Sequence, residues 1–389
     1  MRSDGEECTV GGSLSDPLGG LTAQRWDLLA GGAFYSSSGW VRYCARTRPR
    51  QSGAVVNRSP DGSLSAVPVS AITGAAPLPY QWNEVLRRHN LPQLAASGLV
   101  VGPLQGYQTH FLTSGTAEPV GAVASIVRQA RELRDSMKGP GDRACVAMYL
   151  STEDALLARA AGVPALPVLM DVEAWIEVPA AGWDAWLEML PRRRRKTILR
   201  DRQSFEDAGY RISHLPLADC YQGLGSLAEA TQSKYGDTMP ASFFVGLMKA
   251  QVAVLGDSAR VAVCSRAHGE FVGFCIYYIW QGTVFLRWSG FDYRRLAGGC
   301  EYFNVVYYTH IVRAPETGVR RLHPGVDAIE AKRRRGAELA PLWLLDLDPD
   351  GVLARNPDVI REHNRSLASR YRGDPRTGSA VLEAPDVWA

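Results

Sequence analysis

The chain has 389 residues, of which 46% are hydrophobic and 21% charged, a composition typical of a soluble globular protein of about two domains. No uninterrupted apolar run of about 18 residues occurs, so the sequence predicts no transmembrane helix. The formal net charge of +3 is too small to indicate nucleic-acid binding by itself.

Residues 1–20 are polar and rich in glycine. They lack the basic start and apolar centre of a signal peptide, so we expect a disordered leader on a cytoplasmic protein. The seven cysteines are scattered without a Cys-x-x-Cys pair, and the seven histidines are dispersed. We therefore expect neither a disulfide framework nor a metal site.

The first half of the chain alternates strand and helix signals. Turn residues at 59–63 separate two apolar segments, 54–56 and 64–72, which predicts a β-hairpin. Apolar residues recur at helical spacing over residues 120–137, and a serine followed by acids is typical of the start of a helix over 151–161. Further strands are predicted at 98–102, 144–150 and 168–178.

The second half begins with a helix over 182–190 that ends at Pro191. A strongly basic helix follows as far as Asp207, and Gly209 is placed to close it. The remaining elements predicted in order are a strand at 210–214, helices at 224–235 and 243–254, antiparallel strands at 260–266, 271–280 and 283–288, a helix at 299–312, a short strand before Pro324, a strand at 341–345 and a helix at 356–372. We therefore predict a mixed α/β fold of two related units, in which the first half has a simpler version of the order seen in the second.

Three parts of the sequence carry a family resemblance. They are residues 34–40 with the hairpin, the segment Leu190-Pro-Arg-Arg-Arg-Arg-Lys-Thr-Ile-Leu-Arg200, and the series Phe303, Tyr307-Tyr308, Gly325, Lys332-x-x-Arg335-Gly336 and Pro341. Together they resemble the Fem-like proteins, which have two GNAT acyltransferase folds in tandem. The resemblance implies GNAT-like domains at 21–165 and 166–389, with the acyl-donor cleft in the second. It also implies acyl or aminoacyl transfer to a nitrogen or oxygen nucleophile, from charged tRNA in many members and from acetyl-coenzyme A in others.

Donor binding is predicted at two basic segments and one glycine turn. Residues 192–202 contain seven basic residues and one acid, and this repulsive density favours phosphate binding over a solvated helix face. The turn over 295–300 only partly matches the acetyltransferase loop (Gln/Arg)-x-x-Gly-x-(Gly/Ala), whose backbone N–H groups hold a pyrophosphate. The predicted donor-binding residues are Arg192, Arg193, Arg194, Arg195, Lys196, Arg200, Arg295, Gly298, Gly299 and Arg335.

Three residues are candidates for catalysis. Lys332 could stabilise charge on the carbonyl oxygen, or simply belong to a basic helix end. Tyr308 is a candidate general acid, and His323 a candidate base at the rim of the cleft. Glu301 and Asp327 are the carboxylate alternatives.

The acceptor pocket is predicted from aromatic residues and one acid. These candidates are Tyr35, Trp40, Trp288 and Asp292, where the acid would orient an amine. Aromatic residues at this density more often belong to a hydrophobic core.

The leading hypothesis is an aminoacyl-tRNA-dependent transferase acting on an amine, hydroxylamine or hydroxyl of a small metabolite. It needs charged tRNA and a small acceptor as partners, and no metal, membrane or further cofactor. High usage of Arg, Ala and Gly is typical of a high-GC genome, where such enzymes serve antibiotic pathways, and the family includes seryl transferases of valanimycin-like pathways. The alternatives are an acetyl-coenzyme A-dependent N-acetyltransferase and a non-catalytic RNA- or nucleotide-binding module.

Overall fold

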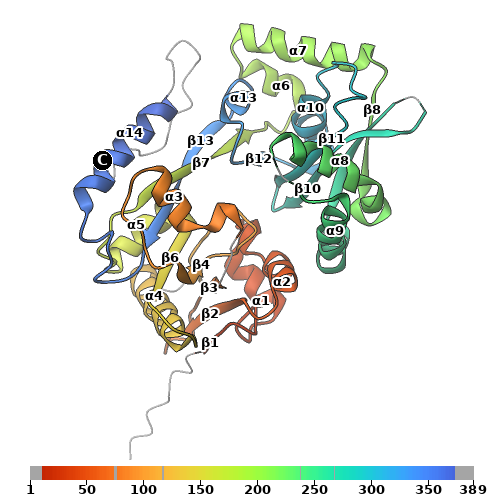
Figure 1. Cartoon of the computed structure of the whole chain (residues 1–389). Coiled ribbons are helices and arrows are strands. Elements are labelled where there is room, and N and C mark those ends of the chain that lie inside the picture. The colour runs from red at the N-terminus through yellow and green to blue at the C-terminus, as the bar shows by residue number, and fades with distance from the viewer. Residues whose placement is uncertain (1–10, 74–76, 116–117, 237, 267, 373–389) are drawn as a thin grey trace, which may run out of the picture. The chain divides into compact units, whose positions relative to one another are not determined.

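The computed structural model describes residues 11–73, 77–115, 118–236, 238–266 and 268–372 (Figure 1). The chain forms two compact units: unit 1 contains the described residues up to Val172 and from Ala340 onward, and unit 2 runs from Glu173 to Leu339. The chain passes between the units within strands β7 (Val168–Glu177) and β13 (Glu338–Asp346). The sequence-based boundaries assign everything from residue 166 onward to one domain. In the structure, residues from 340 group instead with unit 1, because β13 pairs with β6 (Arg143–Leu150).

Unit 1 is built on a mixed sheet. Its strands follow the spatial order β1 (Gly11–Ser13), β2 (Ser52–Arg58), β3 (Leu64–Ile72), β4 (Ser97–Val101), β6 and β13, then the start of β7, while β5 (Leu112–Thr113) pairs with β3. Strands β2 and β3 form the predicted hairpin. Residues 11–13, expected in a disordered leader, pair with β2 as β1; residues 1–10 and the tail from 373 lie outside the described residues.

The helices of unit 1 pack their apolar sides on this sheet. They are α1 (Ala23–Ala30), α2 (Ser38–Thr47), α3 (Trp82–Arg88), α4 (Pro119–Ser136), α5 (Thr152–Ala160) and α14 (Pro357–Arg372), with short 3-10 turns at Phe34–Ser36 and Leu78–Tyr80. Trp26 of α1 and Val41 of α2 share a buried cluster with Ala54 and Val56 of β2. Alternate residues of β2 therefore supply one wall of this core.

Unit 2 has the order of elements that the sequence predicts. Its strands follow the spatial order β7 (from Glu173), β12 (Arg321–Gly325), β11 (Thr283–Phe291), β10 (Phe271–Trp280), β9 (Arg260–Ser265) and β8 (Arg211–Pro216). Its helices are α6 (Trp183–Glu188), α7 (Arg192–Asp207), α8 (Tyr221–Lys234), α9 (Ala241–Leu255), α10 (Glu301–Phe303), the π-helix η5 (Asn304–Tyr308), α11 (Thr309–Val312), α12 (Ala314–Thr317) and α13 (Ile329–Arg333), with 3-10 turns at Leu217–Asp219 and Gly256–Ser258. The predicted mixed α/β fold class is confirmed.

Helices cover both faces of the sheet in unit 2. The ring of Tyr277 in β10 lies 4.5 Å from the ring of His310 in α11, whereas the hydroxyl of Tyr278 donates to Gln251 Oε1 of α9 at 2.5 Å. Because successive side chains of a strand point to opposite faces, α9 and α11 lie on opposite sides of β10. No helix in the described part of the chain is long and apolar enough to cross a membrane.

Candidate functional site

Strands β11 and β12 of unit 2 run side by side and then separate. Their parallel pairing joins residues 283–285 to residues 321–323 and ends at the pair Phe285 and His323. Strand β11 continues to Phe291 along β10, while β12 ends at Gly325, whose φ is 74° and which pairs with Ala174 of β7. From Leu286 onward, the described edge of β11 that faced β12 therefore has no strand partner, and the two strands form a fork.

A cavity of about 130 Å³ lies in this fork. Leu286 to Ser289 of β11 form one wall, Tyr302, Val306 and Tyr307 of the α10–η5 segment a second, and the loop after β12 with Lys332 a third. Ile276 pairs with Trp288 and Tyr277 with Leu286, so Arg287 is the extra residue of a β-bulge in this wall. Bulges re-aim side chains and backbone groups, and they recur beside active sites.

Lys332 holds the loop that forms the third wall. Its side chain is buried, and Nζ donates hydrogen bonds to Gly325 O at 2.8 Å and to Val326 O. In the same loop the non-glycine residues Asp327 and Ala328 have φ of 63° and 45°, a left-handed conformation that costs about 1–3 kcal/mol at each residue. The ammonium group of Lys332 thus stabilises a strained loop and at the same time lines the cavity.

Two other predicted residues, Tyr308 and Arg335, do not line the cavity. They form a buried cluster with Asp201 of α7. Tyr308 donates its hydroxyl proton to Asp201 Oδ2 at 2.8 Å, while Arg335 Nε donates to the Tyr308 hydroxyl and Nη2 to Asp201 Oδ2, each at 3.0 Å. Burial raises the pKa of Tyr308. Sequence reasoning missed Asp201, because one acid inside a basic run has no signal that separates it from a surface charge.

His323, predicted at the rim of the cleft, lies inside the sheet. Its side chain is fully buried, and Nε2 lies 2.8 Å from Glu173 Oε2. Its ring lies 4.7 Å from that of Trp175 and 5.3 Å from that of Phe285. The expectation of a rim position is wrong because the parallel pairing of β11 and β12 still includes His323, and the strands separate only after it.

The glycine turn after β11 is closed by the protein's own side chains. Glu301 is buried at the start of α10, and its Oε1 accepts a hydrogen bond from Ala297 N at 3.0 Å. The Tyr210 hydroxyl lies 2.8 Å from the same nitrogen. A Cβ added to Gly299 would lie 3.1 Å from Ser204 O, so α7 packs directly on the turn. Gly298 has φ of 76° and open space around it, and Arg295 pairs with Glu270.

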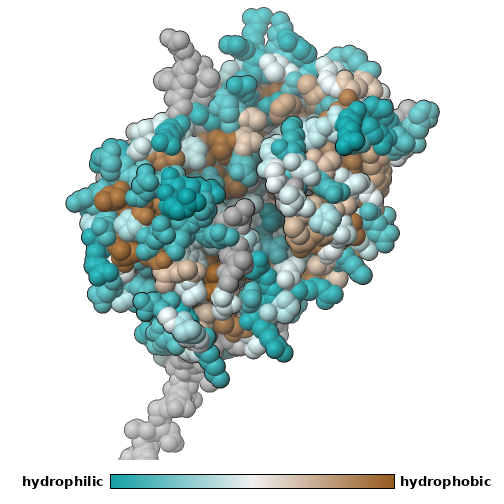
Figure 2. Space-filling model, viewed as in Figure 1, coloured by the Kyte–Doolittle hydropathy of each residue, from teal (hydrophilic) through white to brown (hydrophobic). Residues whose placement is uncertain are grey.

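Helix α7 presents a basic surface. Arg192, Arg193, Lys196 and Arg200 are exposed, and none of them has an ion-pair partner within the described residues. Arg194 donates to the Arg333 carbonyl oxygen at 3.0 Å, and Arg195 Nε is buried without a hydrogen-bond partner in the described chain. Figure 2 shows hydrophilic side chains along the edge formed by α7. The helix also contacts η5, which supplies Val306 and Tyr307 to the cavity.

The corresponding place in unit 1 is filled. Parallel strands β4 and β6 pair from Ser97 with Arg143 to Val101 with Ala147, after which Thr109 bridges to Leu150. A Cβ added to Gly106 would lie 2.6 Å from the Tyr35 side chain, and the Tyr80 hydroxyl donates to the Gly106 carbonyl oxygen. The segment between β4 and β5 thus occupies the space where these strands separate. Tyr35 and Trp40, predicted in the acceptor pocket, are buried in the aromatic cluster behind it, with ring centroids 5.1 Å apart.

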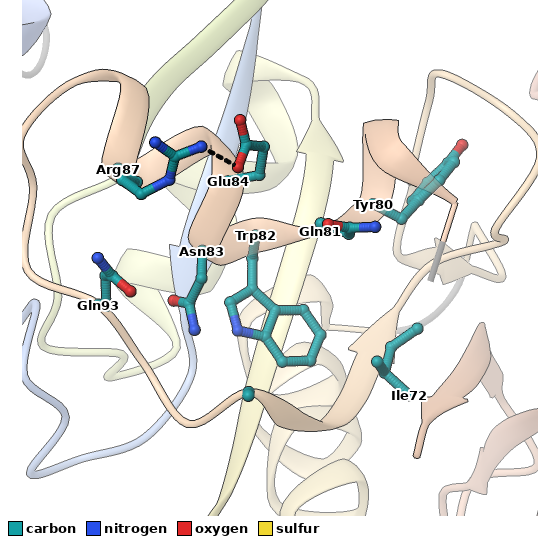
Figure 3. A pocket seen from close by; sticks show the side chains of 9 residues that line it. Ile72, Tyr80, Gln81, Trp82, Asn83, Glu84, Arg87 and Gln93 are labelled. Atoms are coloured by element: carbon teal, nitrogen blue, oxygen red, sulfur yellow. Dashed lines mark hydrogen bonds and ion pairs between the residues drawn. The ribbon is translucent and has the colours of Figure 1, made fainter. Parts of the chain in front are cut away.

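A cavity of about 250 Å³ lies elsewhere in unit 1, beside α3 (Figure 3). Its lining side chains already bind one another or the nearby loop: Glu84 pairs with Arg87 at 2.5 Å, and Asn83 Nδ2 donates to Leu94 O at 2.7 Å. The Trp82 indole N–H donates to Ala95 O at 2.9 Å. Four of the polar side chains that line this cavity are therefore already engaged within unit 1.

The two remaining acceptor candidates belong to unit 2. Trp288 lines the fork cavity, and its ring lies 5.5 Å from that of Phe244 in α9. Asp292 lines a separate groove of about 550 Å³ beside α8, together with Glu229 and Tyr293. Of the predicted catalytic and acceptor residues, the fork therefore brings together Lys332 and Trp288, and it also includes Asp327, one of the two carboxylate alternatives. Among the described residues, no group of three or more His, Cys, Asp or Glu side chains is placed to hold a metal ion.

Comparison with known proteins places the fold. No protein-family model and no curated protein sequence matches the chain. Among solved structures, FemX has a TM-score of 0.56 at 10% identity, covering 84% of this chain and 96% of that one. L-PGS from Bacillus licheniformis has a TM-score of 0.53 at 12% identity, covering 88% and 96%. The C-terminal domain of a putative lysylphosphatidylglycerol synthetase from Agrobacterium fabrum has a TM-score of 0.50 at 11% identity, covering 84% and 92%. The chain therefore has a fold like that of FemX, of L-PGS and of this putative synthetase domain.

Proposed function

We propose that unit 2 transfers an aminoacyl group from an aminoacyl-tRNA to an amine, hydroxylamine or hydroxyl group of a small metabolite. The observation that carries this proposal is the open fork between β11 and β12, whose wall η5 is in contact with the basic helix α7. The sequence resemblance to Fem-like proteins and the fold likeness to FemX support acyl transfer as the type of reaction.

The fork suits an ester that is already activated. The nucleophile attacks the ester carbonyl, a bond to the nucleophile forms, and the carbon–oxygen bond to the ribose breaks. The ribose hydroxyl leaves with the proton that the nucleophile gives up. Backbone N–H groups on the free edge of β11 and the ammonium group of Lys332 would stabilise the negative charge on the carbonyl oxygen. Positioning of the two reactants would supply much of the remaining acceleration.

The charges around the fork favour tRNA over coenzyme A as the donor. A pyrophosphate at the turn over residues 295–300 would meet the buried carboxylate of Glu301, which already takes the Ala297 N–H, and the packed end of α7. By contrast, the exposed arginine and lysine side chains of α7 offer unpaired positive charge to a longer polyanion. Both observations support the hypothesis, suggested by the family resemblance, that the donor is an aminoacyl-tRNA.

The acceptor is proposed to be a small polar metabolite of the cytoplasm, and an antibiotic pathway is the setting that the sequence composition suggests. Asp292 and Glu229 in the groove beside α8 would hold a cationic group of such an acceptor. Since β-strands rise about 3.3 Å per residue, Asp292 lies about 10 Å along the chain from Ser289 in the fork. A small molecule can span that distance.

Radiolabel transfer tests this proposal. The protein is incubated with a panel of amine, hydroxylamine and hydroxyl acceptors and either charged tRNAs labelled in the amino acid or labelled acetyl-coenzyme A. We expect label to reach an acceptor from charged tRNA alone. Label arriving only from acetyl-coenzyme A would replace the proposal with an N-acetyltransferase. RNA binding without transfer from either donor would indicate a non-catalytic binding module.

A further inference from the structure

We propose that Asp327 binds the α-ammonium group of the aminoacyl donor, so that the fork selects aminoacyl esters over simple acyl esters. This inference rests on the proposed function and adds a specificity residue to it. Asp327 lies in the strained loop that follows β12, and it is exposed where it lines the cavity.

Asp327 is the only carboxylate among the described residues that line the fork cavity. No hydrogen bond or ion pair engages its side chain within the described chain. The other acidic side chains nearby already have partners. Glu301 accepts a hydrogen bond from the glycine turn, and Glu330 forms an ion pair with Arg334 at 3.1 Å. Asp327 thus presents an available negative charge to whatever enters the fork.

The cavity has charges of both signs, and Lys332 and Asp327 lie on the same wall, the one formed by the loop after β12. Lys332 and Arg287 line it with positive charge, and Asp327 adds a negative one. The reacting end of an aminoacyl ester has the same pair of features, because a positively charged ammonium group lies one carbon away from the carbonyl that becomes negative during attack. An acetyl or other simple acyl group would leave the carboxylate without a partner. The wall formed by this loop therefore matches an α-amino ester.

The loop is built to keep this carboxylate in place. Asp327 and Ala328 are both left-handed, and the two carbonyl oxygens just before them are held by Lys332 Nζ. Residues held in sparsely populated backbone conformations persist only where their surroundings impose them, and they cluster at ligand-binding sites. In this loop the left-handed conformation is stabilised by Lys332, a buried lysine that also lines the cavity.

Asp327→Asn is the informative variant. Asparagine has the same shape, removes the charge and tolerates the left-handed conformation better than most residues, so the loop should keep its form. Glu330→Gln is the matched control, since it removes one carboxylate from the neighbouring helix α13 outside the cavity. The probes are individually charged tRNAs and the same tRNAs treated with nitrous acid, which converts the α-ammonium group into a hydroxyl of nearly equal size.

The measured quantity is the ratio of dissociation constants for the two forms of each tRNA. For the cognate tRNA we expect the wild type and Glu330→Gln to prefer the aminoacyl form by about tenfold or more, and Asp327→Asn to show a ratio close to one. A wild-type ratio of one, or a preference that survives in Asp327→Asn, would overturn the role of Asp327 while leaving tRNA-dependent transfer intact. Failure of the wild type to bind any charged tRNA would instead overturn the proposed function, and this inference with it.

Discussion

Asp201 and Arg335 form a buried ion pair that ties the basic helix α7 to the segment after α13, with Arg335 Nη2 3.0 Å from Asp201 Oδ2. Tyr308 of η5 bonds to both residues. One cluster therefore links α7, which carries the proposed polyanion surface, to the end of α13 and to the helical wall of the cavity. Loss of one partner would leave an uncompensated charge in the interior.

We predict that Asp201→Ala lowers the free energy of unfolding by about 3–5 kcal/mol, because Arg335 would remain buried and unpaired. Tyr308→Phe should cost only about 1–2 kcal/mol, the effect of losing one hydrogen-bonded hydroxyl. Urea denaturation of the three proteins measures both values. Since the Tyr308 hydroxyl is engaged in this cluster, Tyr308→Phe should keep the transfer rate within about threefold of the wild type. A loss of a hundredfold or more at unchanged stability would instead restore Tyr308 as a general acid.

Salt dependence tests the role of α7. Replacing Arg192, Arg193, Lys196 and Arg200 with Ala should weaken tRNA binding. It should also make the slope of log K against log salt concentration shallower by up to about 3–4, because each lost phosphate contact removes about 0.7–0.9 from the slope. The control replaces Arg25, Arg128, Arg361 and Arg365, exposed arginines of unit 1, with the same change in net charge. Equal slopes for both variants would show that net charge, rather than this helix, governs binding.

Two histidines, the half-buried His214 and the buried His310, predict a loss of stability in acid. His214 Nδ1 lies 2.9 Å from the Tyr277 hydroxyl and Nε2 lies 2.7 Å from Thr309 Oγ1, while His310 Nε2 is buried without a partner in the described chain. Burial lowers the pKa of His214 to about 4 and that of His310 well below its usual value, and Arg313 adds to both effects.

The unfolded chain therefore binds these protons first as the pH falls below about 6.5, so the folded state loses stability between about pH 6.5 and 4. The loss is at most about 1.4 kcal/mol per pH unit for each histidine. His310→Leu should reduce this pH dependence, measured as the free energy of unfolding at pH 7 and pH 5. If the free energy of unfolding differs between pH 7 and pH 5 by the same amount in His310→Leu as in the wild type, His310 does not cause the pH dependence.

Regular periodicity in the sequence predicts much of unit 2. The basic helix ends at Asp207 with Gly209 beyond it, where φ is 70°, as predicted from its composition and its glycine. The strands predicted at 260–266 and 271–280 match β9 and β10 within one residue, because the short turn between them interrupts two strongly apolar segments. Local signals of this kind depend on neighbouring residues, and the sequence contains them in full.

The helix over residues 299–312 shows where such signals fail. A regular α-helix has 3.6 residues per turn. With that spacing, Tyr307 would face the core and Tyr308 would lie on another face of the helix. In the structure, residues 304–308 form a π-helix, and both tyrosines are buried. The wider turn of the π-helix rotates the two side chains relative to the faces that regular helical spacing would give them. No local sequence signal marks the π-helix. Within it, the Tyr308 hydroxyl bonds to Asp201 and Arg335, which lie far from it in the sequence.

Long-range pairing decides the rest of the site. His323 was predicted at a rim because Pro324 and Gly325 follow it, yet the position at which β11 and β12 separate depends on their register. Tyr35 and Trp40 are residue types that often line a binding pocket. In the structure they pack against each other, and the segment around Gly106 fills the space beside them. Such relationships join residues far apart in the chain, and one sequence does not reveal them.

The most direct test of the fork as the acyl site is single-turnover transfer by Ser289→Phe, measured with the dissociation constant for the same charged tRNA. Ser289 lines the cavity, so a phenyl ring there would fill much of its volume of about 130 Å³ while leaving α7 unchanged. We predict that the transfer rate falls by about a hundredfold or more, with tRNA affinity within about twofold of the wild type. Transfer at the wild-type rate by a folded Ser289→Phe protein would contradict the assignment of the reaction to this fork.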